Sequence, residues 1–284
     1  MKTIHECLHQ GIEELQESDT PSLDAEVLLC HILKKEKAYL YTYPSHLLSE
    51  EESDAYDELL KRRQQGEPVA YLVGKKFFWS MEFTVTKEVL IPRPETETLV
   101  EAILQLPLPP EASFLELGTG SGALICALAK EFPQGHHWAT DISNSALKMA
   151  IHNAKHNGLQ SNIQFIESDW FSQIPPLEVD VILSNPPYLS KEDPHLSSLK
   201  YEPLNALVSG PTGLEALFYL IQEASKYLKP GGWLLLEHGC DQEIPVTQAF
   251  TQHGYEHITT LKDLAGLPRV TKGQKFHEGI LKKK

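Results

Sequence analysis

The feature that most constrains the fold is a regular alternation of short apolar runs and helix-length segments over the C-terminal two thirds of the chain. The apolar runs are rich in β-branched and aromatic residues, and each has the length of one buried strand. Strands are expected at SFLELG (113–118), HHWATD (136–141), IQFIES (163–168), VDVILS (179–184) and GGWLLLEHG (231–239). Helices are expected at residues 122–131, 143–157, 214–228 and about 242–253. This alternation predicts a parallel, doubly wound sheet covered by helices.

Two further strands are expected near the C-terminal end, at YEHITTL (255–261) and KFHEGIL (275–281), with no helical segment between them. Consecutive strands without a crossover helix pair in antiparallel fashion. One strand near an edge should therefore run against the others. The predicted fold class is α/β: a Rossmann-like, mostly parallel seven-stranded sheet with an antiparallel strand.

The first part of the chain has a different pattern, that of short helices. Apolar residues recur at helical spacing at Ile4, Leu8, Ile12 and Leu15, and again over residues 25–33. Ser49 and Glu52 form a capping-box signature that opens a third helix. Beyond it, FFWSMEFTV (77–85) predicts a β-hairpin. We expect a small helical domain over residues 1–75, a β-hairpin and linker over 76–94, and the sheet domain over 95–284.

Composition limits the classes of function. Hydrophobic residues make up 41% of the 284 residues and charged residues 23%, as in ordinary soluble globular proteins. No apolar stretch has the form of a signal peptide or the length of a membrane span. The four scattered cysteines and the thirteen histidines lack metal-ligand spacing, which predicts reduced thiols, no metal site and a cytoplasmic location. The net charge of −14 disfavours phosphate contacts, so no direct nucleic-acid binding is expected.

A glycine-rich turn follows the first predicted strand of the sheet. ELGTGSG places Gly118, Gly120 and Gly122 where the chain must turn tightly and let a ligand approach the backbone. The spacing differs from the dinucleotide fingerprint G-x-G-x-x-G, whose helix receives a pyrophosphate. Glu116, at the strand end, disfavours a pyrophosphate and suits a cationic ligand. A plain tight turn is the alternative for the glycines alone.

The next two strands also end on acidic residues. Asp141 stands where a carboxylate accepts hydrogen bonds from ribose hydroxyls, although it could instead cap the helix that begins at Ser143. Asp169 can accept from an adenine amino group, and Trp170 can cover the ring, although Trp170 could instead be a core residue. Together the three strand ends predict a site for an adenosine ligand, and S-adenosylmethionine fits better than a nicotinamide dinucleotide.

The fourth strand ends on Asn185, Pro186, Pro187 and Tyr188. An amide nitrogen is a poor nucleophile because its lone pair is delocalised into the carbonyl. The side-chain oxygen of Asn185 can accept one N–H of a planar NH2 group, and a backbone carbonyl held by the prolines can accept the other. That pair would orient the nitrogen toward a methyl donor and stabilise the positive charge that develops on it. Tyr188 can pack over the planar group.

A second proline-flanked stretch, VLIPRPETE (89–97), precedes the sheet domain. Pro92 and Pro94 stiffen the backbone on both sides of Arg93. The stretch is either a rigid linker or a support that holds Arg93, Glu95 and Glu97 against a site.

These motifs resemble those of the release-factor glutamine methyltransferase family (PrmC, also called HemK). The resemblance covers nearly the whole chain and includes FFWSMEFTV, VLIPRPETE, ELGTGSG, SDWF, SNPPY, YEPLNALVSGPTGL and LLLEHG. It implies a class I methyltransferase domain that uses S-adenosyl-L-methionine, releases S-adenosyl-L-homocysteine, and methylates N5 of the glutamine in the Gly-Gly-Gln motif of bacterial class-1 release factors. The helical domain would then recognise the protein substrate.

The expected site residues follow from both arguments. Cofactor-binding residues are expected to be Glu116, Gly118, Thr119, Gly120, Ser121, Gly122, Asp141, Ile142, Asp169, Trp170 and Asn185. Asn185, Pro186, Pro187 and Tyr188 are expected to be catalytic and to bind the substrate together with Arg93 and Glu95.

Three alternatives remain open from the sequence. The acceptor could be a glutamine of a ribosomal protein, which the IPRPETE and YEPLNAL segments disfavour by family resemblance. It could be an adenine N6 of DNA or RNA, but such an enzyme must grip phosphates and extract a base, for which the acidic chain lacks an evident basic surface. The protein could also be a non-catalytic adenosine-binding module, although cofactor binding alone does not require the Asn-Pro-Pro-Tyr corner.

Overall fold

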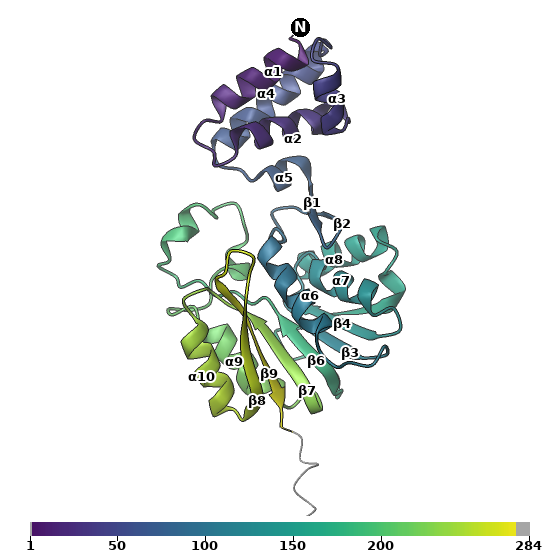
Figure 1. Ribbon diagram of the computed structural model, residues 1–284, viewed down its shortest axis with the longest axis vertical. Coiled ribbons are helices and arrows are strands. Elements are labelled where there is room, and N and C mark those ends of the chain that lie inside the picture. Colours follow the sequence, from purple (N-terminus) through teal and green to yellow (C-terminus); the bar gives the residue numbers. More distant parts are fainter. Residues whose placement is uncertain (1, 277–284) are drawn as a thin grey trace, which may run out of the picture. The chain divides into compact units, whose positions relative to one another are not determined.

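The computed structural model describes residues 2–276. The chain divides into two compact units, Met1–Lys75 and Lys76–Lys284, which are described separately below (Figure 1). No helix in the described part of the chain combines the length and the apolar character that a membrane span requires.

The N-terminal unit is a bundle of short helices. Its helices are α1 (Ile4–Glu14), α2 (Pro21–Leu33), α3 (Lys37–Thr42), α4 (Glu50–Gln64) and α5 (Val69–Val73). The predicted capping box is confirmed, because Ser49 accepts from the Glu52 backbone N–H while the Glu52 carboxylate accepts from that of Ser49. The predicted apolar face of α1 is wrong at Ile12, which is 37% exposed. Gly11 is buried in its place, and a Cβ at that position would lie 2.2 Å from the Tyr56 hydroxyl.

The predicted β-hairpin is confirmed: β1 (Lys75–Phe78) pairs with β2 (Met81–Thr84). Trp79 and Ser80 between them both have positive φ, +49° and +57°, which matches the right-handed twist of a two-residue hairpin. Asn153 of α8 (Asn144–His156) anchors β2, because its carboxamide bonds both the N–H and the C=O of Thr84 at 2.8 and 2.9 Å. The hairpin is thereby fixed to the sheet-containing unit.

The second unit contains a seven-stranded sheet in the order β5-β4-β3-β6-β7-β9-β8 (Figure 1). The strands are β3 (Ser113–Leu117), β4 (His136–Asp141), β5 (Ile163–Glu167), β6 (Val179–Ser184), β7 (Leu228–Glu237), β8 (Tyr255–Lys262) and β9 (Pro268–Lys275). Strands β3 to β7 are parallel, and β9 runs antiparallel to both of its neighbours. The predicted mostly parallel sheet with one antiparallel strand is confirmed.

Two boundaries near the C-terminal end differ from the sequence prediction. The last strand, expected at residues 275–281, falls largely outside the described residues, and β9 occupies Pro268–Lys275 instead. Within β9, a glycine is needed at position 273, where the strand passes the Phe250 ring, since a Cβ there would lie 2.5 Å from that ring. The helix expected at 214–228 ends at Ala224, because β7 already begins at Leu228.

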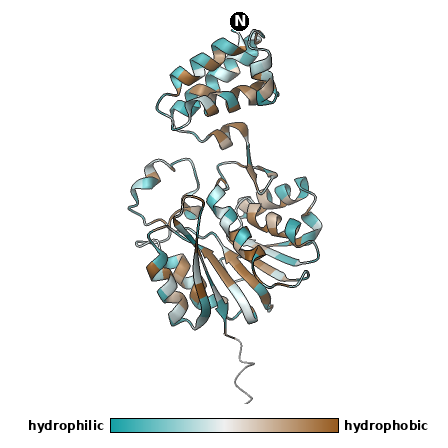
Figure 2. Cartoon of the chain, in the orientation of Figure 1, coloured by the Kyte–Doolittle hydropathy of each residue, from teal (hydrophilic) through white to brown (hydrophobic). Residues whose placement is uncertain are grey.

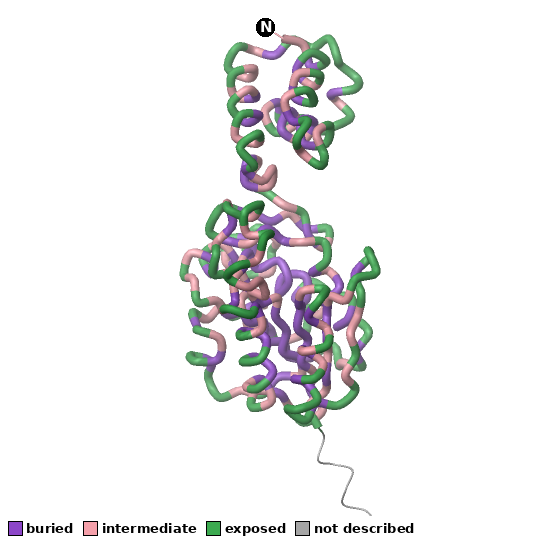
Figure 3. Tube along the Cα trace, turned by 90° about the vertical axis from the view of Figure 1, so that its left-hand side faces the viewer, coloured by how far each residue is buried: buried purple, intermediate pink, exposed green. Residues whose placement is uncertain are grey.

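Helices cover both faces of the sheet and create two apolar cores. The helices that follow the hairpin are α6 (Glu97–Leu104), α7 (Ala123–Glu131), α8, α9 (Glu215–Ala224) and α10 (Glu243–Gln252). Alternate residues of β6 face opposite cores: Val181 and Leu183 pack with α6 and α7, whereas Ile182 packs with α9 and α10. The central strands are accordingly apolar and buried (Figures 2 and 3). Burial on both faces fixes the register of the strands, and thus the edge at which their carboxyl ends meet.

Candidate active site

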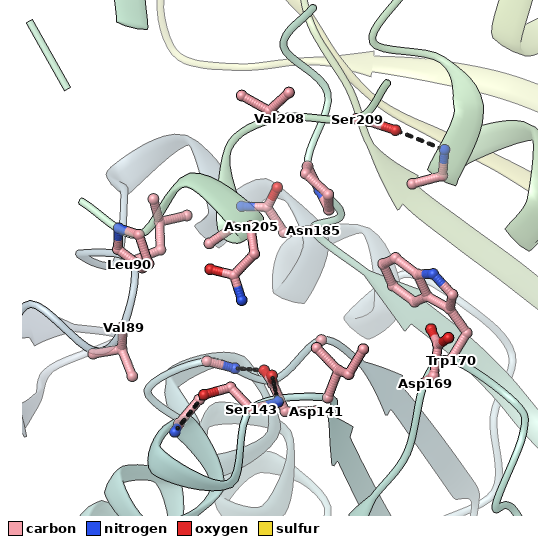
Figure 4. A pocket seen from close by; sticks show the side chains of 18 of the residues that line it. Val89, Leu90, Asp141, Ser143, Asp169, Trp170, Asn185, Asn205, Val208 and Ser209 are labelled. Carbon is pink, nitrogen blue, oxygen red and sulfur yellow. Dashed lines mark hydrogen bonds between the residues drawn. The ribbon is translucent and has the colours of Figure 1, made fainter. Parts of the chain in front are cut away.

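The carboxyl ends of β3, β4, β5 and β6 surround a cavity of about 480 Å³ (Figure 4). Its volume lies in the range of small-molecule sites. We call it the donor cavity. Among the expected cofactor-binding residues, those that line it are Gly118, Gly120, Asp141, Ile142, Asp169, Trp170 and Asn185.

The glycine-rich turn after β3 forms one wall of the donor cavity. Gly118 and Gly120 have φ of +74° and +54°, so the turn depends on glycine. A Cβ at Gly118 would lie 3.7 Å from the Trp170 ring. Gly122 does not line this cavity: its Cα lies against Ala150 of α8, where a Cβ would come within 3.0 Å. Its role is the close packing of α7 against α8.

Asp141, at the end of β4, organises the rim. Its Oδ2 accepts the Gly120 N–H at 2.9 Å and its Oδ1 accepts the Ser143 N–H at 2.9 Å. The N-cap of α8 is Ser143 rather than Asp141, because the Ser143 hydroxyl accepts from the Ala146 N–H. Burial raises the pKa of Asp141 above its ordinary value. Each carboxylate oxygen retains a lone pair for a further donor such as a sugar hydroxyl.

Trp170 lies on the rim of the donor cavity and also packs against the core between the sheet and α9. Its φ is +48°, an uncommon conformation for a bulky residue. Trp170 therefore lines the donor cavity and packs against the core at the same time. Asp169 lies beside it, with its carboxylate at the cavity (Figure 4).

The charge of the donor cavity has one sign. Among the described residues that line it, none is Lys, Arg or His, whereas Glu88, Asp141, Asp169 and Glu215 carry carboxylates. A pyrophosphate would find no cation to pair with there. A ligand with a positive centre and an unphosphorylated adenosine fits the chemistry of this wall.

Glu116 lies below the turn rather than on the donor-cavity wall. It is 2% exposed and accepts the Thr119 hydroxyl at 2.6 Å. Burial raises the pKa of Glu116 to about 8. Glu116, Thr119 and Ser121 line a smaller hollow of about 60 Å³, which also reaches Asn185 and Arg93.

Asn185 is shared between the donor cavity and a second cavity of about 760 Å³, which we call the acceptor cavity. Pro187 lines the first and Tyr188 the second. The Asn185 side-chain NH2 donates to the Thr96 hydroxyl at 3.2 Å. Burial raises the pKa of Tyr188 to about 12, so its phenol is neutral. The corner thus presents one carboxamide to two adjoining cavities.

The backbone of this corner is held from three directions. The Ser184 hydroxyl donates to the Leu117 carbonyl at 2.6 Å, which ties the end of β6 to β3. The Gln242 side-chain NH2 donates to the Tyr188 carbonyl at 2.9 Å. Leu189 forms a parallel bridge with Val208. A carboxamide on such a backbone is pre-positioned rather than mobile.

The VLIPRPETE stretch supports the acceptor cavity. Arg93 forms an ion pair with Glu202, whose carboxylate also accepts the Ile91 N–H at 3.1 Å. This ion pair joins the IPRPETE segment to the YEPLNAL segment. Arg93 and Glu95 both line the acceptor cavity. Glu97 instead accepts the Trp79 N–H of the hairpin turn at 2.8 Å, a structural contact.

Sequence reasoning missed several cavity residues. Leu90 lines both cavities, and Asn205 directs its carboxamide into the donor cavity (Figure 4). Tyr219 of α9 lies on the same wall. Leu90 belongs to the VLIPRPETE stretch and Asn205 to the YEPLNAL stretch. Membership in these two motifs was therefore the one sequence signal that these residues line the site.

Two protein families match the chain. The PrmC N-terminal domain matches residues 6–74, and a methyltransferase domain matches residues 109–279. Two solved structures share the fold. A methyltransferase from Pyrococcus furiosus has a TM-score of 0.55 and 19% identity, with coverage of 76% of this chain and 99% of that one. The hMettl16 catalytic domain has a TM-score of 0.59 and 12% identity, with coverage of 88% of this chain and 92% of that one.

Curated relatives match over most of their length. The release factor glutamine methyltransferase of Aliivibrio fischeri is 42% identical, with coverage of 96% of this chain and 97% of the relative. The relative from Coxiella burnetii is 47% identical, with coverage of 89% of this chain and 91% of the relative. The relative from Escherichia coli is 40% identical, with coverage of 95% of this chain and 98% of the relative. With both domains matched and such identity over most of its length, the chain belongs to the release factor glutamine methyltransferase family.

Proposed function

We propose that this protein transfers a methyl group from S-adenosyl-L-methionine to the side-chain nitrogen of the glutamine in the Gly-Gly-Gln motif of bacterial class-1 release factors. The observation that carries the proposal is the position of Asn185, which lines both the donor cavity and the acceptor cavity. The curated relatives named release factor glutamine methyltransferases support the choice of acceptor.

The donor cavity would hold the cofactor, which supplies an electrophilic methyl group on a sulfonium. The Asp141 carboxylate would accept hydrogen bonds from the ribose, and Asp169 would accept from the adenine amino group while Trp170 covers the ring. The turn at Gly118 and Gly120 would let the backbone approach the ligand closely. The four lining carboxylates favour the cationic donor over its neutral product, S-adenosyl-L-homocysteine.

The acceptor amide would bind at the Asn185 corner. The Asn185 side-chain oxygen would accept one N–H of the glutamine, and the Pro186 carbonyl would accept the other. The nitrogen would form its bond to the methyl carbon as the carbon–sulfur bond breaks. Both acceptors stabilise the positive charge that appears on nitrogen. The methylated nitrogen is then strongly acidic and releases a proton to water, so no side-chain base is needed before transfer.

The remaining surface of the acceptor cavity would receive the backbone around the glutamine. Tyr188 provides an apolar wall, and Arg93 and Glu95 provide charged groups at the same cavity. We assign residues 1–75 as the substrate-recognition domain, which is the region matched by the PrmC N-terminal domain. The reaction is assigned to the cytoplasm, where release factors act.

The proposal is tested by offering the protein methyl-labelled S-adenosylmethionine with purified release factor, ribosomal proteins or DNA in separate reactions. We expect label on the release factor alone, and none on a release factor whose Gly-Gly-Gln glutamine is replaced. Label on ribosomal protein or DNA without label on the release factor would overturn the assignment.

A further inference from the structure

The turn between β8 and β9 is a surface feature that the proposed reaction does not use. It covers residues 263–267, and we call it the β8–β9 turn. Because β9 is antiparallel to β7, with Val270 beside Glu237, this turn lies at the edge of the sheet where β7 ends (Figure 1). The carboxyl ends of β3 to β6 meet at the same edge. The turn therefore lies at the edge that carries the two cavities.

A buried carboxylate fixes the backbone of the turn. The Asp263 side chain is 3% exposed, and its Oδ1 accepts the N–H groups of Ala265 and Leu267, each at 3.0 Å. The backbone adds two bonds at 2.9 Å, from the Asp263 N–H to the Leu267 carbonyl and from the Gly266 N–H to the Asp263 carbonyl. Gly266 has a φ of +78°, which glycine adopts without strain. One conformation of the turn is thus stabilised from inside the protein.

The same carboxylate connects the turn to the acceptor cavity. Asp263 Oδ2 accepts from Nε and Nη2 of Arg269 at 3.2 and 3.1 Å. Arg269 lines the acceptor cavity together with Tyr188 and Glu237. The Arg269 carbonyl accepts the His238 N–H at 2.9 Å, which attaches this part of β9 to the end of β7. A single residue, Arg269, therefore links the turn to the wall of the cavity.

The fixed turn presents apolar side chains to solvent. Leu264 is fully exposed, at 102%, and Leu267 is 45% exposed. Residues 264–268 include no charged side chain. Single exposed leucines are common on protein surfaces, but these two stand on an ordered backbone beside a cavity assigned to a protein segment. An ordered backbone loses little conformational entropy on binding, so more of the contact energy appears as affinity.

We propose that the β8–β9 turn is a preformed docking contact for the protein substrate. Leu264 and Leu267 would pack on an apolar patch of the release factor, next to the segment that carries the acceptor glutamine. The inference rests on the proposed function, because it concerns the same acceptor protein. Leu264 lines neither cavity, so an acceptor that fills only the acceptor cavity makes no contact with it. The contact therefore favours a whole protein over a small amide.

A second copy of this chain is the other candidate occupant of the turn. A stable dimer interface buries about 800 Å² on each partner. Two leucines on one short turn provide only a small part of such an area. They suit an additional contact beside a larger one, and the acceptor cavity of about 760 Å³ offers the larger contact to the release factor.

The first test compares three variants in steady-state methylation of purified release factor. Leu264→Ser removes the exposed apolar side chain, and Leu264→Met keeps an apolar one. Leu104→Ser is the control, because Leu104 is 42% exposed and lines neither cavity. We expect Leu264→Ser to raise KM for release factor about 10-fold, with unchanged kcat and unchanged donor affinity. Leu264→Met and Leu104→Ser should keep the wild-type KM.

The second test concerns the fixed backbone. A Cβ at Gly266 meets nothing within 4 Å, but alanine is strained at its positive φ. Gly266→Ala should raise KM for release factor about 3-fold although both leucines are unchanged. Gly254→Ala is the matched control, since Gly254 also has a positive φ, +76°, and open space around it. Equal KM values for the two variants would contradict a preformed contact.

The outcomes separate this inference from the proposed function. Absence of release factor methylation by the wild type contradicts the proposed function, on which the docking contact rests. If the wild type methylates release factor, three results overturn the docking contact alone: a wild-type KM in Leu264→Ser, equal rises in Leu264→Ser and Leu104→Ser, or a loss in kcat instead of KM. Self-association of the wild type that Leu264→Ser abolishes, measured by analytical ultracentrifugation, would assign the turn to a second copy and would also overturn it.

Discussion

The two cavities that share Asn185 are built in different ways. The donor cavity is assembled from consecutive strand ends, with backbone turns and carboxylates on its wall. The acceptor cavity depends on pairs from distant parts of the sequence, such as Arg93 with Glu202 and Asn185 with Thr96, and it is lined by charges of both signs. The regular edge of a sheet is sufficient to bind a small ligand that is the same in every reaction. A segment of a protein substrate needs a binding surface that brings together residues from distant parts of the sequence.

The substitution Asn185→Ala distinguishes the roles of the two cavities most clearly. We expect methyl transfer to fall roughly 100- to 1,000-fold, because the substitution removes an acceptor that acts on the developing charge. Donor affinity should change little, since the glycine turn, Asp141 and Trp170 remain. Steady-state kinetics with release factor and calorimetry with donor measure the two quantities. Equal turnover in the variant would remove Asn185 from the reaction.

Asp141→Ala should have the opposite effect. Loss of hydrogen bonds to a charged group should weaken donor binding about 10- to 100-fold, while kcat at saturating donor stays closer to the wild type. Titration calorimetry gives the affinity, and a melting curve controls for the lost bonds to Gly120 and Ser143. Unchanged affinity would contradict the ribose assignment.

Gly120 and Gly122 lie in the same turn but should respond differently to alanine. Both have positive φ, so each substitution should cost roughly 1–2 kcal/mol in backbone strain. A Cβ at Gly120 meets nothing within 4 Å, whereas one at Gly122 lies 3.0 Å from Ala150. Gly122→Ala should therefore lose a further 1–2 kcal/mol or so of unfolding free energy. Denaturant titration measures it, and equal losses would contradict the packing role.

The smallest effect concerns Glu116 below the donor turn. Burial raises the pKa of Glu116 from an ordinary 4.5 to about 8, so the unfolded chain releases this proton at lower pH than the folded one. Glu116 therefore lowers stability as pH rises from about 4.5 toward 8. Over that pH range, the melting temperature of Glu116→Gln should rise relative to that of the wild type. A constant difference between the two proteins would show that the carboxyl is not desolvated.

The sequence predicted the donor side of the site better than the acceptor side. Strands β3 to β6 follow from local apolar runs, and their ends bring Gly118, Asp141 and Trp170 together by topology alone. The pairing of Arg93 with Glu202 joins residues 109 positions apart, and no local pattern encodes it. The same holds for the hydrogen bond between Asn185 and Thr96, which lie 89 positions apart.

The errors in the predicted fold also have specific causes. Ile12 was expected in the core because it is apolar, but α1 presents Gly11 to Tyr56, and a glycine carries no hydropathy signal. The last strand was expected at residues 275–281, whereas β9 occupies Pro268–Lys275, a segment that contains a proline and a glycine. Only the contact of β9 with Phe250 shows why a glycine is required within a strand.

In the proposed reaction, a methyl group passes from the donor cavity to an amide nitrogen held at the Asn185 corner. The most direct measurement is mass spectrometry of a release factor after incubation with S-adenosylmethionine and either the wild type or Asn185→Ala. We expect one added methyl group on the side-chain nitrogen of the Gly-Gly-Gln glutamine with the wild type, and almost none with the variant. A methyl group on another residue, or equal modification by both proteins, would contradict it.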